Sequence, residues 1–259
     1  MLGLGSTLMG GAVIPSGISS PLDLGDLNLY YDFSTTTGSN GATIDTFANA
    51  GTSGSDYDLT AHSTSSKRPT IDTSTLSKRS AQFTNDRFTT DNVYVTTGET
   101  FTIFYIMKKG TISANDAWLT GTENSPINQL KHGSHRALII QCNGEVDSDG
   151  DNSSLTLFTD DTNGGTSNVT MDTDTHLFIW TKAADETVNV YQDTSFMTTG
   201  THPTDGDETT NFRIENLGEE NDGGASLEAH IGEFGIYNKV LSADEITQLQ
   251  TFLIDKWGL

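Results

Sequence analysis

The sequence predicts an all-β protein: a two-sheet antiparallel jelly-roll sandwich with one short C-terminal α-helix and an extended N-terminal arm. Hydrophobic residues make up only 34% of the 259 residues, and Thr, Ser, Gly, Asn and Asp fill much of the rest. That composition is typical of many short strands joined by polar turns. From residue 27 onward apolar residues recur with a period of two, and a helical period is found only at the C-terminal end.

Residues 1–26 are predicted to form an arm, and residues 27–259 the sandwich. The arm is rich in apolar side chains, but its glycines and Pro15 interrupt any regular period. Because an isolated apolar arm would fray, we expect it to bind a neighbouring copy of the chain or another protein, or to pack across its own sandwich. Its candidate partner-binding residues are Leu2, Leu4, Leu8, Met9, Val13 and Ile14.

About a dozen short strands are predicted after the arm. The opening strand, 27–33, alternates Leu27, Leu29, Tyr31 and Phe33 with other residues, and a turn-rich segment follows it to residue 66. The segment 101–107 is apolar on both faces apart from Thr102, which indicates a central position in a sheet. Polar turns separate the other candidates, which favours a sandwich. These candidates lie at 81–83, 92–95, 117–120, 136–142, 155–159, 176–181, 187–192, 212–216 and 227–237.

The one predicted helix is the last element. Ser242 and Glu245 have the spacing of a capping box, in which the serine hydroxyl accepts from the glutamate amide and the carboxylate reaches back. Gly258 is expected to end the helix. An apolar stripe at helical spacing must cover the sandwich. The stripe consists of Ile246, Leu249, Leu253 and Trp257.

Charge and cysteine content exclude several classes of function. The formal net charge is −22 and the pI is about 4.3, so the surface repels nucleic-acid phosphates and anionic lipid head groups. One cysteine, Cys142, allows no intrachain disulfide and is interpreted as a small buried side chain. The sequence has neither an apolar run long enough to span a membrane nor the basic start of a signal peptide. We therefore expect synthesis in a cytoplasm without export.

The C-terminal stretch is the most specific part of the sequence. Residues 230–246 (HIGEFGIYNKVLSADEI) and 252–259 (FLIDKWGL) closely resemble the end of laminin-G-like, or concanavalin A-like, domains. Looser matches lie at 29–33, 68–69, 81–83, 101–104 and 180–191. Where such domains have a Y-x-N-G turn, this chain has Tyr191-Gln-Asp-Thr194. The resemblance covers about residues 27–259 and implies a lectin-like sandwich that serves binding or structure and is not an enzyme.

The start of the chain has a second, weaker resemblance. Residues 1–6 (MLGLGS) look like the openings of virion structural proteins of tailed bacteriophages, which commonly carry laminin-G-like domains in head decorations, tails or fibres. The absence of a signal peptide and of disulfides fits assembly in a host cytoplasm.

Two loops, one acidic and one containing histidines, are candidates for chemistry. Glu145, Asp147 and Asp149 approach the E-x-D-x-E strand of glucanases with a lectin-like fold, but flanking glycines favour a hairpin loop. The overlapping segment 147–151 could bind calcium through alternating oxygens, although its spacing departs from an EF-hand and a solvated acidic loop is favoured. His132 and His135 lack an obvious third metal ligand and are interpreted as part of a polar loop.

From the sequence we expect a non-enzymatic virion structural protein of a tailed phage, decorating the capsid or forming part of a tail or fibre. Its sandwich would face outward, and its arm would contact other virion proteins and copies of the chain in a homo-oligomeric assembly. The alternative is a carbohydrate-binding adhesin module, with or without calcium, and a remote alternative is a glycoside hydrolase. No other cofactor is implied.

Overall fold

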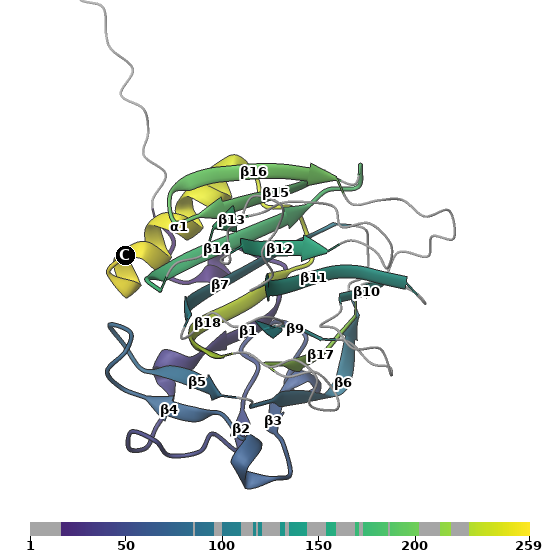
Figure 1. Ribbon diagram of the computed structural model, residues 1–259. Coiled ribbons are helices and arrows are strands. Elements are labelled where there is room, and N and C mark those ends of the chain that lie inside the picture. The colour runs from purple at the N-terminus through teal and green to yellow at the C-terminus, as the bar shows by residue number, and fades with distance from the viewer. Residues whose placement is uncertain are drawn as a thin grey trace, which may run out of the picture.

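A computed structural model of the chain describes residues 17–84, 86–95, 100–109, 116–117, 119–120, 130–132, 135–143, 154–158, 169–170, 173–185, 187–201, 213–218 and 228–259 (Figure 1). These residues fold almost entirely into antiparallel β-sheet, with one α-helix at the C-terminal end. The predicted fold class, an all-β sandwich with a C-terminal helix, is confirmed. No helix in these ranges is both long and apolar enough to span a bilayer.

The larger sheet has eight strands among the described residues. In spatial order it contains β16 (Ser195–Thr201), β15 (Thr187–Gln192), β14 (Thr175–Lys182), β7 (Phe101–Lys109), β18 (Glu228–Tyr237), β5 (Ser80–Thr84) and β4 (Thr70–Asp72), and β1 (Leu27–Asp32) also pairs with β18. Strand β7 lies in the interior of this sheet, as its apolar sequence predicted, and its residues 101–107 are all buried.

Strand β18 organises the larger sheet because it pairs with three strands. It pairs with β7 along one side, while on the other side its first half pairs with β5 and its second half with β1. The register shifts between Ile231 and Glu233, around Gly232. A Cβ atom at Gly232 would lie 2.6 Å from Cη2 of Trp257, so only glycine lets the C-terminal helix approach the strand this closely.

The opposite layer consists of shorter strands in two groups. The first group comprises β2 (Thr46–Phe47), β3 (Leu59–Ala61), β6 (Phe88–Val95), β17 (Arg213–Leu217) and β9 (Leu119–Thr120). The second comprises β10 (Leu130–His132), β11 (His135–Asn143), β12 (Ser154–Phe158), β13 (Val169–Thr170) and β8 (Asp116–Ala117). Several of these strands are only two or three residues long, which explains why no periodic pattern revealed β2 or β3 within the segment interpreted as turns.

The larger sheet is buried on both faces by two hydrophobic clusters. One cluster fills the space between the sheet layers and contains Tyr31, Phe83, Tyr105 and Trp180 among its buried side chains. The other lies between the larger sheet and the C-terminal helix α1 (Ala243–Trp257) and includes Phe104, Ile179 and Trp257. The apolar stripe of α1 therefore packs on a face of the larger sheet, and Figure 1 shows the helix lying against that sheet.

Both ends of α1 follow the prediction from local sequence. The Ser242 hydroxyl accepts from the Glu245 amide, and the Glu245 carboxylate accepts from the Ser242 amide at 2.8 Å. Gly258 adopts the left-handed conformation with φ 71°, and its amide donates to the Ile254 carbonyl. A capping box and a glycine stop thus define the helix.

Several details differ from the expected elements. No candidate was proposed for strands β4, β10 and β13. Phe33 starts the 3-10 helix η2 (Phe33–Thr35) and does not extend β1. Strand β16, for which no candidate was proposed, follows a turn in which the non-glycine residue Asp193 has φ 52°. The described part of the predicted arm, residues 17–26, contains the 3-10 helix η1 (Pro21–Leu24) and packs on the second hydrophobic cluster through Ile18 and Leu24.

Candidate functional site

Most of the residues singled out from the sequence lie outside the described ranges. This holds for the partner-binding residues Leu2, Leu4, Leu8, Met9, Val13 and Ile14, for the carboxylates Glu145, Asp147 and Asp149, and for the segment 147–151. His132 and His135 lie in strands β10 and β11 and are direct cross-strand partners, where a polar loop was expected. Cys142 is in β11, opposite Leu155 and Asp116.

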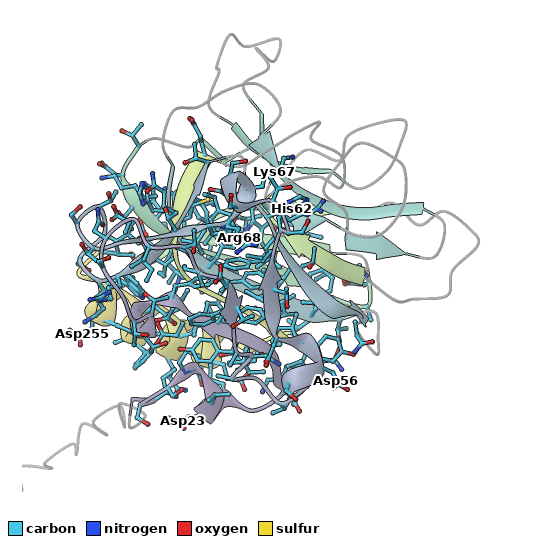
Figure 2. All side chains as sticks on the ribbon, turned by 90° about the horizontal axis from the view of Figure 1, so that it is seen from below. Asp23, Asp56, His62, Lys67, Arg68 and Asp255 are labelled. Atoms are coloured by element: carbon cyan, nitrogen blue, oxygen red, sulfur yellow. The ribbon has the colours of Figure 1, made fainter. Side chains whose placement is uncertain are left out.

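Among the described residues, basic side chains gather around the 3-10 helix η4 (Ser65–Lys67), which precedes β4. The group comprises His62, Lys67 and Arg68, to which Arg87 is joined through its backbone, and we call it the η4 basic cluster. Figure 2 shows His62, Lys67 and Arg68 together, away from the labelled acidic residues Asp23 and Asp255. Three of the chain's 13 Lys and Arg residues lie in this cluster.

Backbone hydrogen bonds hold the η4 basic cluster together. The His62 amide donates to the Arg87 carbonyl at 3.1 Å, and the Arg87 amide donates to the Lys67 carbonyl at 3.2 Å. Arg87 directly precedes β6, so the position of β6 in its sheet fixes this end of the cluster. The cluster is therefore built by contacts between β3, η4 and β6, which are separated in the sequence.

The guanidinium of Arg68 fixes the loop on which the cluster is built. Its Nε donates to the His62 carbonyl and its Nη2 to the Ser63 carbonyl, both at 2.9 Å, and its Nη1 forms a 2.9 Å ion pair with Asp45. A guanidinium has five N–H donors, so these contacts leave donors that can point outward. Arg68 therefore holds the loop in place through its hydrogen bonds and also places a positive charge at a fixed position.

The cluster offers hydrogen-bond donors more than acceptors. The Thr64 amide donates to Nδ1 of His62 at 3.0 Å, so a neutral His62 ring carries its proton on Nε2. Lys67 and Arg68 have only donors. Such a set binds carboxylate, sulfate or phosphate groups, whose oxygens accept charge-assisted hydrogen bonds.

Two nearby carboxylates reduce the positive charge of the cluster but do not cancel it. Asp45 is exposed and paired with Arg68. Asp86 is 6% exposed, and its carboxylate accepts from the Thr84 amide at 2.7 Å. Charges more than roughly 8 Å away are largely screened at physiological ionic strength. Lys67, Arg68 and Arg87 together with Asp45 and Asp86 leave one formal positive charge in this group, although the whole chain has a net charge of −22.

A second polar group lies on the larger sheet, where β18 passes β5. Nδ1 of His230 lies 3.9 Å from Oδ1 of Asp72, and in the described residues this nitrogen and the Ser80 hydroxyl are buried without a hydrogen-bond partner. Burial lowers the pKa of His230, the Lys108 charge adds to this, and Asp72 opposes it. Ser80 is fully buried, so we interpret this group as part of the interior and not as a ligand site.

A third polar group connects α1 to the sheet. Glu233 of β18 is fully buried and accepts hydrogen bonds from the Tyr30 hydroxyl at 3.1 Å and from Nε1 of Trp257 at 3.0 Å. Lys256 contacts the same carboxylate and lies 2.7 Å from Asp32. Every partner belongs to β1, β18 or α1, so this group stabilises the helix on the sheet.

One feature of the sequence indicates the η4 basic cluster, namely the spacing of its cations. Cations are scarce in this chain, yet Lys67, Arg68 and Arg87 lie within about twenty residues of one another. In the sequence, Arg68 belongs to a segment, 68–69, that resembles the laminin-G-like pattern. In the described parts of the chain, no group of three or more His, Cys, Asp or Glu side chains is placed to hold a metal ion.

No protein-family model matches the sequence, and no curated protein matches it. Solved structures do share its fold. A GH54 α-L-arabinofuranosidase is similar over 93% of this chain and 66% of its own, with a TM-score of 0.65 and 10% identity. The binding domain of botulinum neurotoxin serotype D is similar over 91% of this chain and 53% of its own, with a TM-score of 0.55 and 13% identity.

A Trypanosoma rangeli sialidase in complex with the inhibitor DANA is also similar, over 93% of this chain but only 34% of its own, with a TM-score of 0.53 and 13% identity. The chain therefore spans about a third of the sialidase. At these identities the likeness establishes the fold alone: the chain is a lectin-like β-sandwich.

These comparisons correct one expectation. The prediction that the chain is not an enzyme is wrong as an inference from the fold, because the structures that share the fold include sialidases and an arabinofuranosidase. A lectin-like sandwich occurs within glycosidase chains as well as in a toxin's binding domain. The fold therefore gives no reason to exclude enzymatic activity.

Proposed function

We propose that this chain is a carbohydrate-binding β-sandwich whose η4 basic cluster contacts the acidic groups of a glycan. The observation that carries the proposal is the partly exposed, fixed guanidinium of Arg68, which lies in a segment joined by backbone hydrogen bonds to His62, Lys67 and Arg87 in a chain whose net charge is −22. A fixed Arg68 and the donors beside it suit the carboxylate of an acidic sugar or the sulfate of a sulfated one.

The names of the similar structures support a saccharide ligand by analogy of fold. One is a sialidase in complex with sialic acid, an acidic sugar, and another is an arabinofuranosidase. Fold-level analogy does not identify a ligand by itself. The cluster indicates the chemical class of the ligand, because its hydrogen-bond donors favour an anionic sugar over a neutral one.

The test is a comparison of acidic and neutral glycans on an array, followed by titration of the strongest hit. Lys67→Glu should weaken binding of an acidic glycan by at least about tenfold, because it replaces an attractive charge with a repulsive one. The matched control is Lys78→Glu, which changes an exposed lysine beyond the other end of β4 and should leave binding unchanged.

Salt dependence provides an internal check on the same interaction. Binding that depends on the cluster should weaken as ionic strength rises, since exposed ion pairs are screened. An array without hits would contradict the proposal, as would equal affinities for the Lys67→Glu and Lys78→Glu variants.

The assignment to a tailed-phage particle, with its laminin-G-like domain facing outward, remains a second proposal. It is favoured by the N-terminal segment, because residues 1–22 contain no ionisable side chain while the chain as a whole is strongly acidic. Deletion of residues 1–16 should leave the described sandwich folded, since η1 still packs on it, and should prevent incorporation into particles. Normal incorporation of the truncated chain, measured by mass spectrometry of purified particles, would contradict a role for this segment.

A further inference from the structure

An amine and two carboxyl groups meet between α1 and the larger sheet. Asp32 of β1 and Glu233 of β18 are direct cross-strand partners, so their side chains leave the sheet on the same face. Nζ of Lys256, in the last turn of α1, contacts Oε1 of Glu233 and lies 2.7 Å from Oδ2 of Asp32. The fold thus holds a nucleophile beside a carboxyl group, and groups held in this way react as if they were very concentrated.

The two carboxyl groups share a single counter-charge. Glu233 is fully buried, whereas Asp32 and Lys256 are each partly exposed. Across β7 the residue paired with Glu233 is the apolar Ile106. Among the described residues, the titratable groups that face Glu233 are therefore Tyr30 and Asp32 on β1 and Lys256 on α1. Burial raises the pKa of Glu233 and the Asp32 charge adds to the rise, while the Lys256 charge opposes it. A neutral carboxylic acid at Glu233 is therefore populated at mildly acidic pH.

Two hydrogen-bond donors activate this carboxyl group toward attack by an amine. Oε2 of Glu233 accepts from the Tyr30 hydroxyl at 3.1 Å, and Oε1 accepts from Nε1 of Trp257 at 3.0 Å. Fixed donors stabilise the negative charge that a carbonyl oxygen gains in a tetrahedral intermediate. A neutral carboxylic acid is also a better electrophile than a carboxylate anion. Glu233 is therefore suited to be the electrophile, and Asp32 is placed to take a proton from Lys256.

We propose that Lys256 and Glu233 form an isopeptide bond that joins α1 covalently to β18. Asp32 accepts a proton from the Lys256 ammonium, and the free amine attacks Cδ of the neutral Glu233 acid. A C–N bond forms and the C–OH bond breaks, and the hydroxyl leaves as water after receiving a second amine proton through Asp32. The first proton stays on Asp32 until it is released to solvent. The products are an amide and one water molecule, so no oxidant or other reactant is needed.

The bond would replace a buried ionic group by a neutral amide. The two partners are 23 positions apart in the sequence, so the bond would close a loop that contains the whole connection from β18 into α1. The amide oxygen would keep the hydrogen bonds from Tyr30 and Trp257. At pH 7 the neutral acid is scarce and the site is held by the ion pair, so freshly prepared chain is expected to be unlinked. This inference does not depend on glycan binding.

Mass spectrometry of the full chain during incubation at pH 5 tests the bond. We expect a species lighter by one water molecule, which accumulates with time and accumulates more slowly at pH 7. Trypsin should leave the peptide 214–239 joined to 240–259, because an acylated Lys256 is not cleaved. An unchanged mass at both pH values would overturn the proposal. So would a link from Lys256 to the peptide 1–67, which contains Asp32.

Two variants and an internal control identify the reacting groups. Lys256→Arg keeps the positive charge without the nucleophilic amine and should abolish the linked peptide. Asp32→Ser keeps a residue that can cap η2 but removes the proton acceptor, and should slow linkage at least about tenfold. The Lys239–Glu245 ion pair, at 2.8 Å and partly exposed, should stay unlinked. Far-UV circular dichroism checks that both variants fold.

Three results of these controls would overturn the proposal. The first is linkage at both ion pairs, and the second is an equal rate in Asp32→Ser and the unchanged chain. The third is a loss of water that persists unchanged in Lys256→Arg, which would indicate a succinimide at one of the Asp-Gly sequences.

Discussion

Lys256→Met is expected to lower the free energy of unfolding at pH 7 by about 3–5 kcal/mol, the usual cost of removing one partner from a buried ion pair. The ammonium of Lys256 lies between the carboxylates of Asp32 and Glu233. Glu233 is fully buried. Without Lys256 its carboxylate would keep the hydrogen bonds from Tyr30 and Trp257 but would lose its counter-charge in a medium of low dielectric constant.

The pH dependence of this loss distinguishes a charge effect from a packing effect. Burial raises the pKa of Glu233, and the Asp32 charge adds to the rise, while Lys256 and Trp257 oppose it. Removing Lys256 raises that pKa further. A carboxyl with a higher pKa in the folded than in the unfolded state contributes stability below its unfolded pKa of about 4.5, and that contribution is lost as pH rises. The penalty of Lys256→Met should therefore be smaller at pH 5 than at pH 7.

Urea denaturation followed by circular dichroism at both pH values provides the measurement. Lys78→Met serves as the control because it removes a charge from an exposed side chain, for which a change within about 0.5 kcal/mol is expected. Adding Glu233→Gln to Lys256→Met should recover part of the stability, since the amide needs no counter-charge. A penalty that is the same at pH 5 and pH 7, without recovery by the second substitution, would refute the electrostatic explanation.

Trp257→Ala is expected to cost about 3–5 kcal/mol, the range for truncating a large buried aromatic side chain. The Trp257 side chain is 2% exposed, packs over Gly232 and donates to Glu233. Its loss would open a cavity between α1 and the larger sheet and weaken the hydrogen bonding of a buried carboxylate. Phe252→Ala in the same helix is a suitable comparison, because Phe252 is only partly buried and should cost less.

The contact with Gly232 makes this prediction more specific. Gly232→Ala would place a methyl group 2.6 Å from the Trp257 ring, and overpacking of this kind costs about 1–3 kcal/mol. In a Trp257→Ala background the ring is absent, so Gly232→Ala should cost much less. A double-mutant cycle measured by urea denaturation would reveal this coupling. Additive effects of the two substitutions would contradict the proposed packing of Trp257 on Gly232.

Both predictions concern the packing of α1 on the larger sheet, whereas the proposed glycan contact lies elsewhere. Lys67 ends η4 and Arg68 follows it, whereas the ionic group of Glu233 and Lys256 lies between α1 and the larger sheet. Substitutions in the two regions should therefore separate cleanly, with Lys67→Glu altering ligand binding and Lys256→Met altering stability. This separation allows the stability tests to serve as folding controls for the binding tests.

Elements defined by short-range sequence patterns were predictable from the sequence alone. The capping box of Ser242 and Glu245, the apolar stripe ending at Trp257 and the glycine stop at Gly258 all involve residues within one helix. The apolar run of β7 likewise indicated a strand buried on both faces. The net charge of −22 is likewise a property of the sequence alone.

The tertiary structure decided which distant residues meet. The Tyr30 hydroxyl reaches the Glu233 carboxylate across 203 positions of sequence because β1 and β18 are neighbouring strands. The backbone of Arg87 meets the segment of His62 and Lys67 because β3, η4 and β6 are brought together there. Phe196 and Met197 are exposed on β16, which is the last strand in the spatial order of the larger sheet among the described residues. Periodicity and capping are local properties of a chain, whereas strand order, buried ion pairs and surface clusters depend on contacts that form only when the sheets assemble.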